Sequence, residues 1–216
     1  LQEKIADYCQ QNGITLYMFL LAVLNLQLHR LSGQNRFTVG SPIVNRDDIN
    51  LEHMIGLFAT AIPLSCNITE YMTFAQLAEH SKQTAIEAYE NHLYPSNLVI
   101  DQLQIDRDLS RSKLFSVMYG LQNNKQKLLK SLHFDGLTYN PRIYDFIEDS
   151  SRFDLSFAFD ELEHGIEINL NYNSDLFKKS TAERFVEQFI LLANQVVAMP
   201  ELPINKYELV GEGDKL

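Results

Sequence analysis

The sequence of 216 residues lacks most of the features that indicate a secreted, membrane-bound or nucleic-acid-binding protein. Two cysteines, Cys9 and Cys66, are too few for a disulfide framework, so we expect a reducing compartment and a cytoplasmic location. There is no excess of basic side chains. The formal net charge of −10 argues against nucleic acid or an anionic membrane as the main partner.

The signatures of metal and nucleophile sites are also missing. The patterns HExxH, CxxC and GxSxG and a glycine-rich phosphate loop do not occur. Cys9 and Cys66 lie in apolar-periodic contexts, which favours small core residues over nucleophiles. No pair of histidines has metal-ligand spacing, so each is expected on the surface or the side of a helix: His29, His53, His80, His92, His133 and His164. The sequence therefore predicts no catalytic residue and no metal site.

Long hydrophobic runs are absent too. The most apolar stretch, residues 16–28, is too short to cross a bilayer and contains Asn25 and Gln27, which favours a buried helix. The first residue is Leu, and no charged segment precedes an apolar one in signal-peptide order. We therefore expect a piece of a longer protein. Its apolar content of 45% is ordinary for a globular domain.

Hydrophobic periodicity predicts helices and strands in mixed order. Helices are expected at residues 1–11, 15–31, 73–89, 97–103 and 181–198, with a single helical turn at 51–55. Strands are expected at residues 36–44, 57–68, 115–121, 137–145, 153–159 and 165–172. The 57–68 strand is mostly apolar, which predicts a central position in the sheet. The last two strands should form a hairpin.

These elements indicate a mixed β-sheet with flanking helices, an α/β or α+β sandwich. Thr15 should cap the second helix and Gly33 should end it, while Ser180 or Thr181 should cap the last helix. Pro200 and Pro203 follow the last helix. We therefore expect a domain over residues 1–199 and a linker over 200–216.

Six segments in order resemble motifs of the condensation domains of nonribosomal peptide synthetases. The family motifs are SGQ…VGTPVANR, IGxFVNT…LR, HQDYPFE, RDxSRNPLF, KFDL and YNTDLF. The matching residues here are 32–34 with 39–46, then 55–58 with 63–64, 91–95, 107–118, 152–155 and 172–177. One match alone would be weak, but six in the family's order over nearly the whole chain form a strong resemblance.

The resemblance implies half of a condensation domain. The family fold has two chloramphenicol-acetyltransferase-like lobes that face each other across a tunnel, and all six matched motifs belong to the C-terminal lobe. The family's active-site motif, His-His-x-x-x-Asp-Gly, belongs to the N-terminal lobe, and this sequence has no His-His pair. The isolated chain is therefore expected to be inactive.

By this resemblance the whole enzyme forms an amide bond in nonribosomal peptide synthesis. It joins a donor acyl or peptidyl thioester to the amine of an aminoacyl acceptor, and both ride on phosphopantetheine arms of carrier domains. No cofactor is expected on this chain itself. The implied partners are the N-terminal lobe, the donor and acceptor carrier domains, and an adenylation domain after the linker.

Phe58, Thr60 and Ala61 are the candidates for the substrate side of the tunnel, by the resemblance alone. The family's Val-Asn-Thr reads Ala59-Thr60-Ala61 here, and Ser65 stands where the family often has Arg. Thr60 keeps a hydroxyl but is shorter than the family's Asn and lacks its amide donor. These departures affect fine substrate contacts rather than the fold.

The RDLSR segment has two interpretations. In the structural one, which we prefer, Arg107, Asp108 and Arg111 form an ion and hydrogen-bond cluster with Ser110 that fixes the loop before a strand, because the planar guanidinium pairs bidentately with a carboxylate. In the functional one, the cluster faces the tunnel or a carrier domain and holds a pantetheine phosphate.

Other functions remain compatible with the same residues. A relative with this fold could epimerise, form esters, or serve as a non-catalytic platform that recruits carriers or other partners. A stand-alone binding domain with no transferase ancestry is a further alternative. An intact His-His-x-x-x-Asp-Gly upstream would favour amide formation, and a broken one would favour a platform.

Overall fold

The computed structural model describes residues 1–51, 53–69, 71–103, 114–122 and 151–211. The elements are α1 Gln2–Asn12, α2 Leu16–Ser32, β1 Arg36–Val44, the 3-10 turn Ile49–Leu51, β2 Ala59–Asn67, α3 Phe74–Glu90, α4 Ser96–Gln102, β3 Val117–Gln122, β4 Leu155–Leu162, β5 Gly165–Tyr172, α6 Lys179–Ala198 and the 3-10 turn Ile204–Lys206. The strand expected at 137–145 and the RDLSR segment lie outside the described residues.

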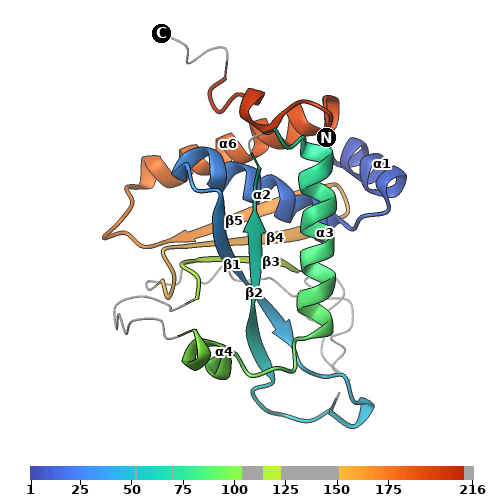
Figure 1. Ribbon diagram of the computed structural model, residues 1–216, viewed down its shortest axis with the longest axis vertical. Helices are drawn as coiled ribbons and strands as arrows, with labels where there is room; N and C mark the ends of the chain where they lie inside the picture. Colours follow the sequence, from blue (N-terminus) through green and yellow to red (C-terminus); the bar gives the residue numbers. More distant parts are fainter. Residues whose placement is uncertain (52, 70, 104–113, 123–150, 212–216) are drawn as a thin grey trace, which may run out of the picture.

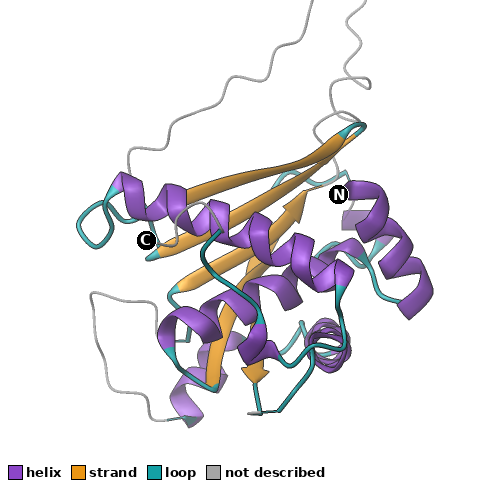
Figure 2. Ribbon diagram, turned by 90° about the horizontal axis from the view of Figure 1, so that it is seen from above, coloured by secondary structure: helices purple, strands orange, loops and turns teal. Residues whose placement is uncertain are grey.

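The sheet is mixed, as predicted. In the part of the chain that the structure describes, five strands run in the order β2-β1-β3-β4-β5. Strand β1 pairs antiparallel with β2 and parallel with β3; β3 pairs parallel with β4, and β4 antiparallel with β5. Leu162 pairs with Gly165, so the expected hairpin closes over a two-residue turn. Helices α2, α3 and α6 lie over one face of this sheet (Figure 2).

The predicted central position of the 57–68 strand is wrong for the sheet that the described residues form, because β2 stands at one end of its strand order and pairs there with β1. Its apolar content has another cause. Ile62, Leu64 and Cys66 alternate toward the helices and are buried there, whereas Ser65 on the opposite face is exposed. The alternation marks one covered face, as on an antiparallel strand with one solvated side.

Helix α2 forms the centre of the core. It contacts α1, α3, α6 and β3, and every residue from Phe19 to Gln27 is buried. The predicted ends are confirmed: the Thr15 hydroxyl accepts a hydrogen bond from the Met18 amide at 3.2 Å, and Gly33 ends the helix with φ of 69°. A helix surrounded on all sides is apolar all round, which explains its lack of a polar face.

Helix α6 starts earlier than expected. Its N-cap residue is Lys178, whose carbonyl accepts from the Thr181 and Ala182 amides, so neither Ser180 nor Thr181 caps it. The ring of Phe177 packs edge-on against Phe185 with centroids 5.7 Å apart. This packing of the residue before the cap fixes where the helix begins, and it outweighs the capping preference of the hydroxyl side chains.

The segment after α6 packs on the domain. The Pro200 carbonyl accepts from the Ala75 amide, and the Ile204 amide donates to Met72 O. Ile204 and Tyr207 are both buried in the core. The first part of the segment that we expected to be a linker is therefore an integral part of the folded unit as far as Tyr207.

Candidate functional site

The tunnel candidates lie where the β1–β2 loop meets β2: Phe58 ends the loop, and Thr60 and Ala61 are in the first residues of the strand. The two strands pair from Arg36–Asn67 to Val44–Ala59, and the Asn45 amide extends the ladder to Phe58 O at 3.4 Å. Residues 45–58 then run past the end of the sheet, at the bottom of Figure 1. The loop begins with the Asn-Arg pair of the first motif and ends with Phe58.

The three candidates are neighbours in the sequence, but the structure does not place them on one surface. Phe58, Thr60 and Ala61 are each half-buried. Thr60 shares its strand face with the helix-covered Ile62, and Ala61 points to the opposite face, because side chains alternate along a strand. Thr60 and Ala61 therefore line different sides of β2.

Arg46 folds the loop back on itself. Its guanidinium lies over the Phe58 ring, 4.2 Å from the centroid, and its Nη1 donates a hydrogen bond to Leu51 O. A cation over an aromatic face is attracted by the ring's quadrupole. The position of Phe58 is thus set from the other end of the loop. Arg46 belongs to the Asn45-Arg46 pair of the first motif, but the sequence does not reveal that its partner is the Phe58 ring.

A second contact ties the loop to the end of α3. His92 Nε2 lies 2.7 Å from Asp47 Oδ2, and His92 Nδ1 lies 2.5 Å from Tyr89 O. The His92 ring also stacks on Tyr89 with centroids 5.2 Å apart. The hydrogen bond to the Tyr89 carbonyl, and after it the bond to Asp47, raise the pKa of His92.

Sequence reasoning missed this pair. His92 was expected to be a surface or helix-side residue, and the sequence does not single out Asp47. The two residues are 45 positions apart, and no periodicity connects a loop after a strand to the turn that follows a helix. Only the hairpin geometry of β1 and β2, which carries the loop under α3, brings them together.

The VGSP motif, residues 39–42, has a structural role in the middle of strand β1. Gly40 lies beneath the ring of Phe115, and the Ser41 hydroxyl accepts from the Tyr17 hydroxyl at 2.7 Å. The Tyr119 hydroxyl in turn donates to Tyr17 O at 2.6 Å. Burial raises the pKa of both tyrosines, so their hydroxyls stay protonated donors.

Apolar side chains are exposed around the loop and α4. They are Val44, Ile49, Met54, Ile55, Leu57, Leu93, Tyr94, Leu98 and Leu103. We call this set the apolar end. A hollow of about 280 Å³ adjoins it between β2, α3 and α4, lined by Ile62, Pro63 and Tyr94 among others. A concentration of exposed apolar residues indicates a surface that packs against another one.

Within the described ranges, no three His, Cys, Asp or Glu side chains are grouped as metal ligands. In the same part of the chain, no single helix is long and apolar enough to cross a membrane. Helices α1 and α2 meet that test only together, and they are bent by 104°. Cys9 and Cys66 are both buried free thiols, which confirms their expected place in the core.

Comparison with known proteins agrees with this geometry. The family model for the condensation domain matches residues 1–215. Gramicidin S synthase 2 of Brevibacillus brevis is 34% identical over 215 residues, which are 100% of this chain and 5% of that protein. Surfactin synthase subunit 2 of Bacillus subtilis (strain 168) is 35% identical over 205 residues, 95% of this chain and 6% of that protein. The chain thus spans about a twentieth of these relatives.

Solved structures share the fold. A four-domain nonribosomal peptide synthetase bound to AMP and glycine matches 97% of this chain with a TM-score of 0.84 and 19% identity, over 17% of its own length. The first condensation domain of the CDA synthetase matches 97% of this chain and 45% of its own, with a TM-score of 0.73 and 16% identity. The X-domain of teicoplanin biosynthesis, in complex with OxyB, matches 97% of this chain and 46% of its own at a TM-score of 0.83 and 22% identity.

Proposed function

The chain belongs to the condensation-domain family, and we propose that it is the C-terminal half of a condensation domain in a nonribosomal peptide synthetase. The observation that carries this proposal is the length of the match. The family model covers this whole chain, yet the chain covers just under half of a solved condensation domain. The order of the six motifs, all typical of the C-terminal lobe, supports the same assignment.

This half would form part of the tunnel wall and would not supply the general base. The sequence has no His-His pair. Of the two described histidines in and beside the loop, His53 is exposed and His92 is bonded through both nitrogens. Phe58 would border the tunnel together with one of Thr60 and Ala61, because these two side chains point to opposite faces of β2. The apolar end has the composition of a face that packs against another lobe.

The substrates of the whole enzyme would reach the tunnel on phosphopantetheine arms. Donor and acceptor are then thioesters on two carrier domains, and one amide bond forms as one thioester bond breaks. RDLSR, residues 107–111, is a contact for a carrier only if the functional interpretation of that segment holds. Beyond Tyr207, the chain would lead toward an adenylation domain.

The proposal is tested by comparing the full-length protein with residues 1–216 alone, each incubated with a loaded donor carrier and a loaded acceptor carrier. Full-length protein should form the amide, and the isolated chain should give no product above the uncatalysed rate, because general-base or positioning chemistry needs the other lobe. Amide formation by the isolated chain would overturn the half-domain assignment. An ester or an epimerised acyl group as the only product would replace amide formation by those alternatives.

A non-catalytic platform is the second candidate. The teicoplanin X-domain has the same half-fold at a TM-score of 0.83, and its structure is of a complex with OxyB. A platform would bind a partner protein or a carrier without releasing product. Binding of loaded carriers by full-length protein, with no turnover over many hours, would favour this function.

A further inference from the structure

The loop that carries Phe58 is held at two points. At its base, the Asn45 amide bonds to Phe58 O, and Arg46 stacks on the Phe58 ring. At the next residue, Asp47 bonds to His92 beyond the end of α3. The contact that fixes Asp47 therefore also fixes the backbone that presents Arg46, and through Arg46 the ring of Phe58.

We propose that Asp47 and His92 form a pH-sensitive clamp that holds the β1–β2 loop against α3 and thereby positions Phe58 in the wall of the tunnel. The positioning step rests on the proposed function, whereas the clamp itself rests on the geometry of the loop. His92 is a positioning residue here, because it reaches Phe58 only through Asp47 and Arg46.

The clamp needs the charged form of His92. The Tyr89 carbonyl can only accept a hydrogen bond, so Nδ1 must carry a proton. A neutral ring has one N–H, and with that proton on Nδ1 the bare Nε2 would face the Asp47 carboxylate, acceptor against acceptor. Only the imidazolium donates to both partners. Deprotonation of His92 therefore converts an attraction into a repulsion.

The surrounding charges favour the imidazolium. From the loop, Asp47 faces the ring, and from α3 the Tyr89 side chain stacks on it. Neighbouring carboxylates on the same two elements have other partners: Asp48 accepts from Asn50, and Glu87 accepts from Gln83. The pKa of His92 is raised, so the clamp is complete at pH below the ordinary histidine value and opens as pH rises through the raised one.

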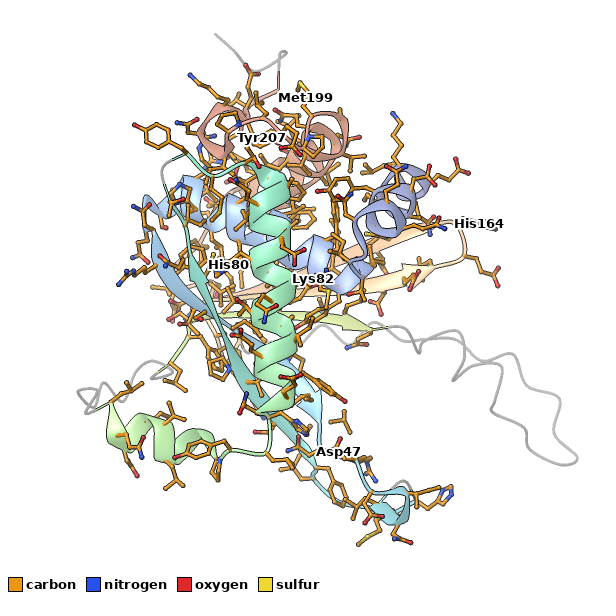
Figure 3. The ribbon with its side chains drawn as sticks, turned by 45° about the vertical axis from the view of Figure 1, so that its right-hand side comes forward. Asp47, His80, Lys82, His164, Met199 and Tyr207 are labelled. Atoms are coloured by element: carbon orange, nitrogen blue, oxygen red, sulfur yellow. The ribbon has the colours of Figure 1, made fainter. Side chains whose placement is uncertain are left out.

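The test measures hydrogen exchange of the amides at residues 45–58 in the full-length protein. Four forms are compared: wild type, Asp47→Asn, His92→Gln and the double variant. His164→Gln is the matched control, since His164 is an exposed histidine in the β4–β5 turn, far from Asp47 (Figure 3). Protection is expressed relative to the intrinsic exchange rate at each pH, which removes the pH dependence of the chemistry itself.

At pH 6, each single variant should lose loop protection at least threefold, and the double variant should lose no more than the singles, because both changes remove the same contact. At pH 9, wild type should be as unprotected as His92→Gln, whereas Asp47→Asn should regain protection because its amide can donate to the neutral Nε2. The control should match wild type at both values. Equal protection in wild type and both single variants at pH 6 would overturn the clamp, as would additive losses in the double variant.

Activity then tests the positioning step. At pH 6 the single variants should raise KM for the loaded carriers severalfold with little change in melting temperature. At pH 9 wild type should show the same KM as His92→Gln. A pH-dependent loop with unaltered KM would overturn the positioning of Phe58. A wild type that makes no product while its loop exchange follows pH as expected would overturn the proposed function and leave the clamp standing.

Discussion

The Phe115 ring lies so close above Gly40 that a β-carbon at position 40 would be 2.2 Å from Phe115 Cε2. Phe115 is itself almost fully buried and tilts against Phe153, with centroids 5.7 Å apart. The backbone of Gly40 is not in the left-handed region, so the glycine is needed for space rather than for conformation. The contact joins the VGSP motif to the strand entry that follows RDLSR.

Gly40→Ala should therefore lower the free energy of unfolding by about 1–3 kcal/mol, as expected for overpacking against a ring that cannot move away. Gly165→Ala is the matched control, since nothing lies within 4 Å of its β-carbon position. Adding Phe115→Leu to Gly40→Ala should cost less than the sum of the two single changes. Urea denaturation of the four variants measures this, and an unchanged midpoint for Gly40→Ala would contradict it.

Asp108→Asn tests the structural interpretation of RDLSR. If Asp108 pairs with Arg107 or Arg111 in a buried cluster, removing its charge should lower stability by roughly 3 kcal/mol or more. Asp101→Asn, at an exposed carboxylate of α4, should stay within about 0.5 kcal/mol of wild type. An unchanged melting temperature together with weaker, less salt-sensitive carrier binding would establish the functional interpretation, in which the cluster holds a pantetheine phosphate.

Tyr207 should stabilise the domain although it lies beyond the last helix. Its ring is 1% exposed, its hydroxyl donates to Met199 O at 2.6 Å, and Arg30 Nη1 donates to its carbonyl (Figure 3). Tyr207→Ala should cost about 3–5 kcal/mol as a large core truncation, and Tyr207→Phe about 1 kcal/mol for the hydroxyl. Tyr71→Phe, at an exposed tyrosine, is the control. Equal denaturant midpoints for Tyr207→Ala and wild type would mean that this segment does not stabilise the fold.

Sequence patterns predicted most of the fold because its elements are locally specified. The hydroxyl of Thr15 and the left-handed Gly33 delimit α2, and the alternation in β4 and β5 predicts their hairpin. Errors arose where a tertiary contact, rather than the local sequence, determines the position or the start of an element. The edge position of β2 depends on strand order, and the start of α6 depends on Phe177 meeting Phe185.

The site was less predictable for the same reason. Phe58, Thr60 and Ala61 could be selected only through a family motif, and nothing in the motif indicates that Thr60 and Ala61 point to opposite faces of β2. The Asp47–His92 pair joins two loops that are remote in sequence. The burial of Tyr207 was hidden behind Pro200 and Pro203, which are typical of a linker but here only end a helix.

Both thiols should be unreactive in the native protein. Burial raises the pKa of Cys9 to about 11 and that of Cys66 to about 12. At pH 8 an aromatic disulfide reagent should label neither residue in the folded chain and both after unfolding in guanidinium, because the thiolate is the reacting form. A folded state that resists ionisation loses stability as pH rises above the ordinary thiol pKa, so unfolding should become easier above roughly pH 8.5. Rapid labelling of either thiol in native protein would contradict this.

The apolar end should make the isolated chain self-associate. Ile55 and Leu57 are 103% and 95% exposed, so they have almost no contacts within this chain to lose. Burying one such side chain in an interface contributes about 1.5–3 kcal/mol, and every 1.4 kcal/mol changes a dissociation constant about tenfold. The double variant Ile55→Lys, Leu57→Lys should therefore weaken association at least about 100-fold without lowering the melting temperature. Leu176→Lys, at an exposed leucine before α6, should leave association unchanged.

Sedimentation over a concentration series measures both, and a wild-type chain that stays monomeric at high concentration would mean that these side chains do not form an interface. If they pack on the other lobe instead of on a second copy, the same double variant in the full-length protein should lower both stability and turnover, whereas association of the full-length protein should not change.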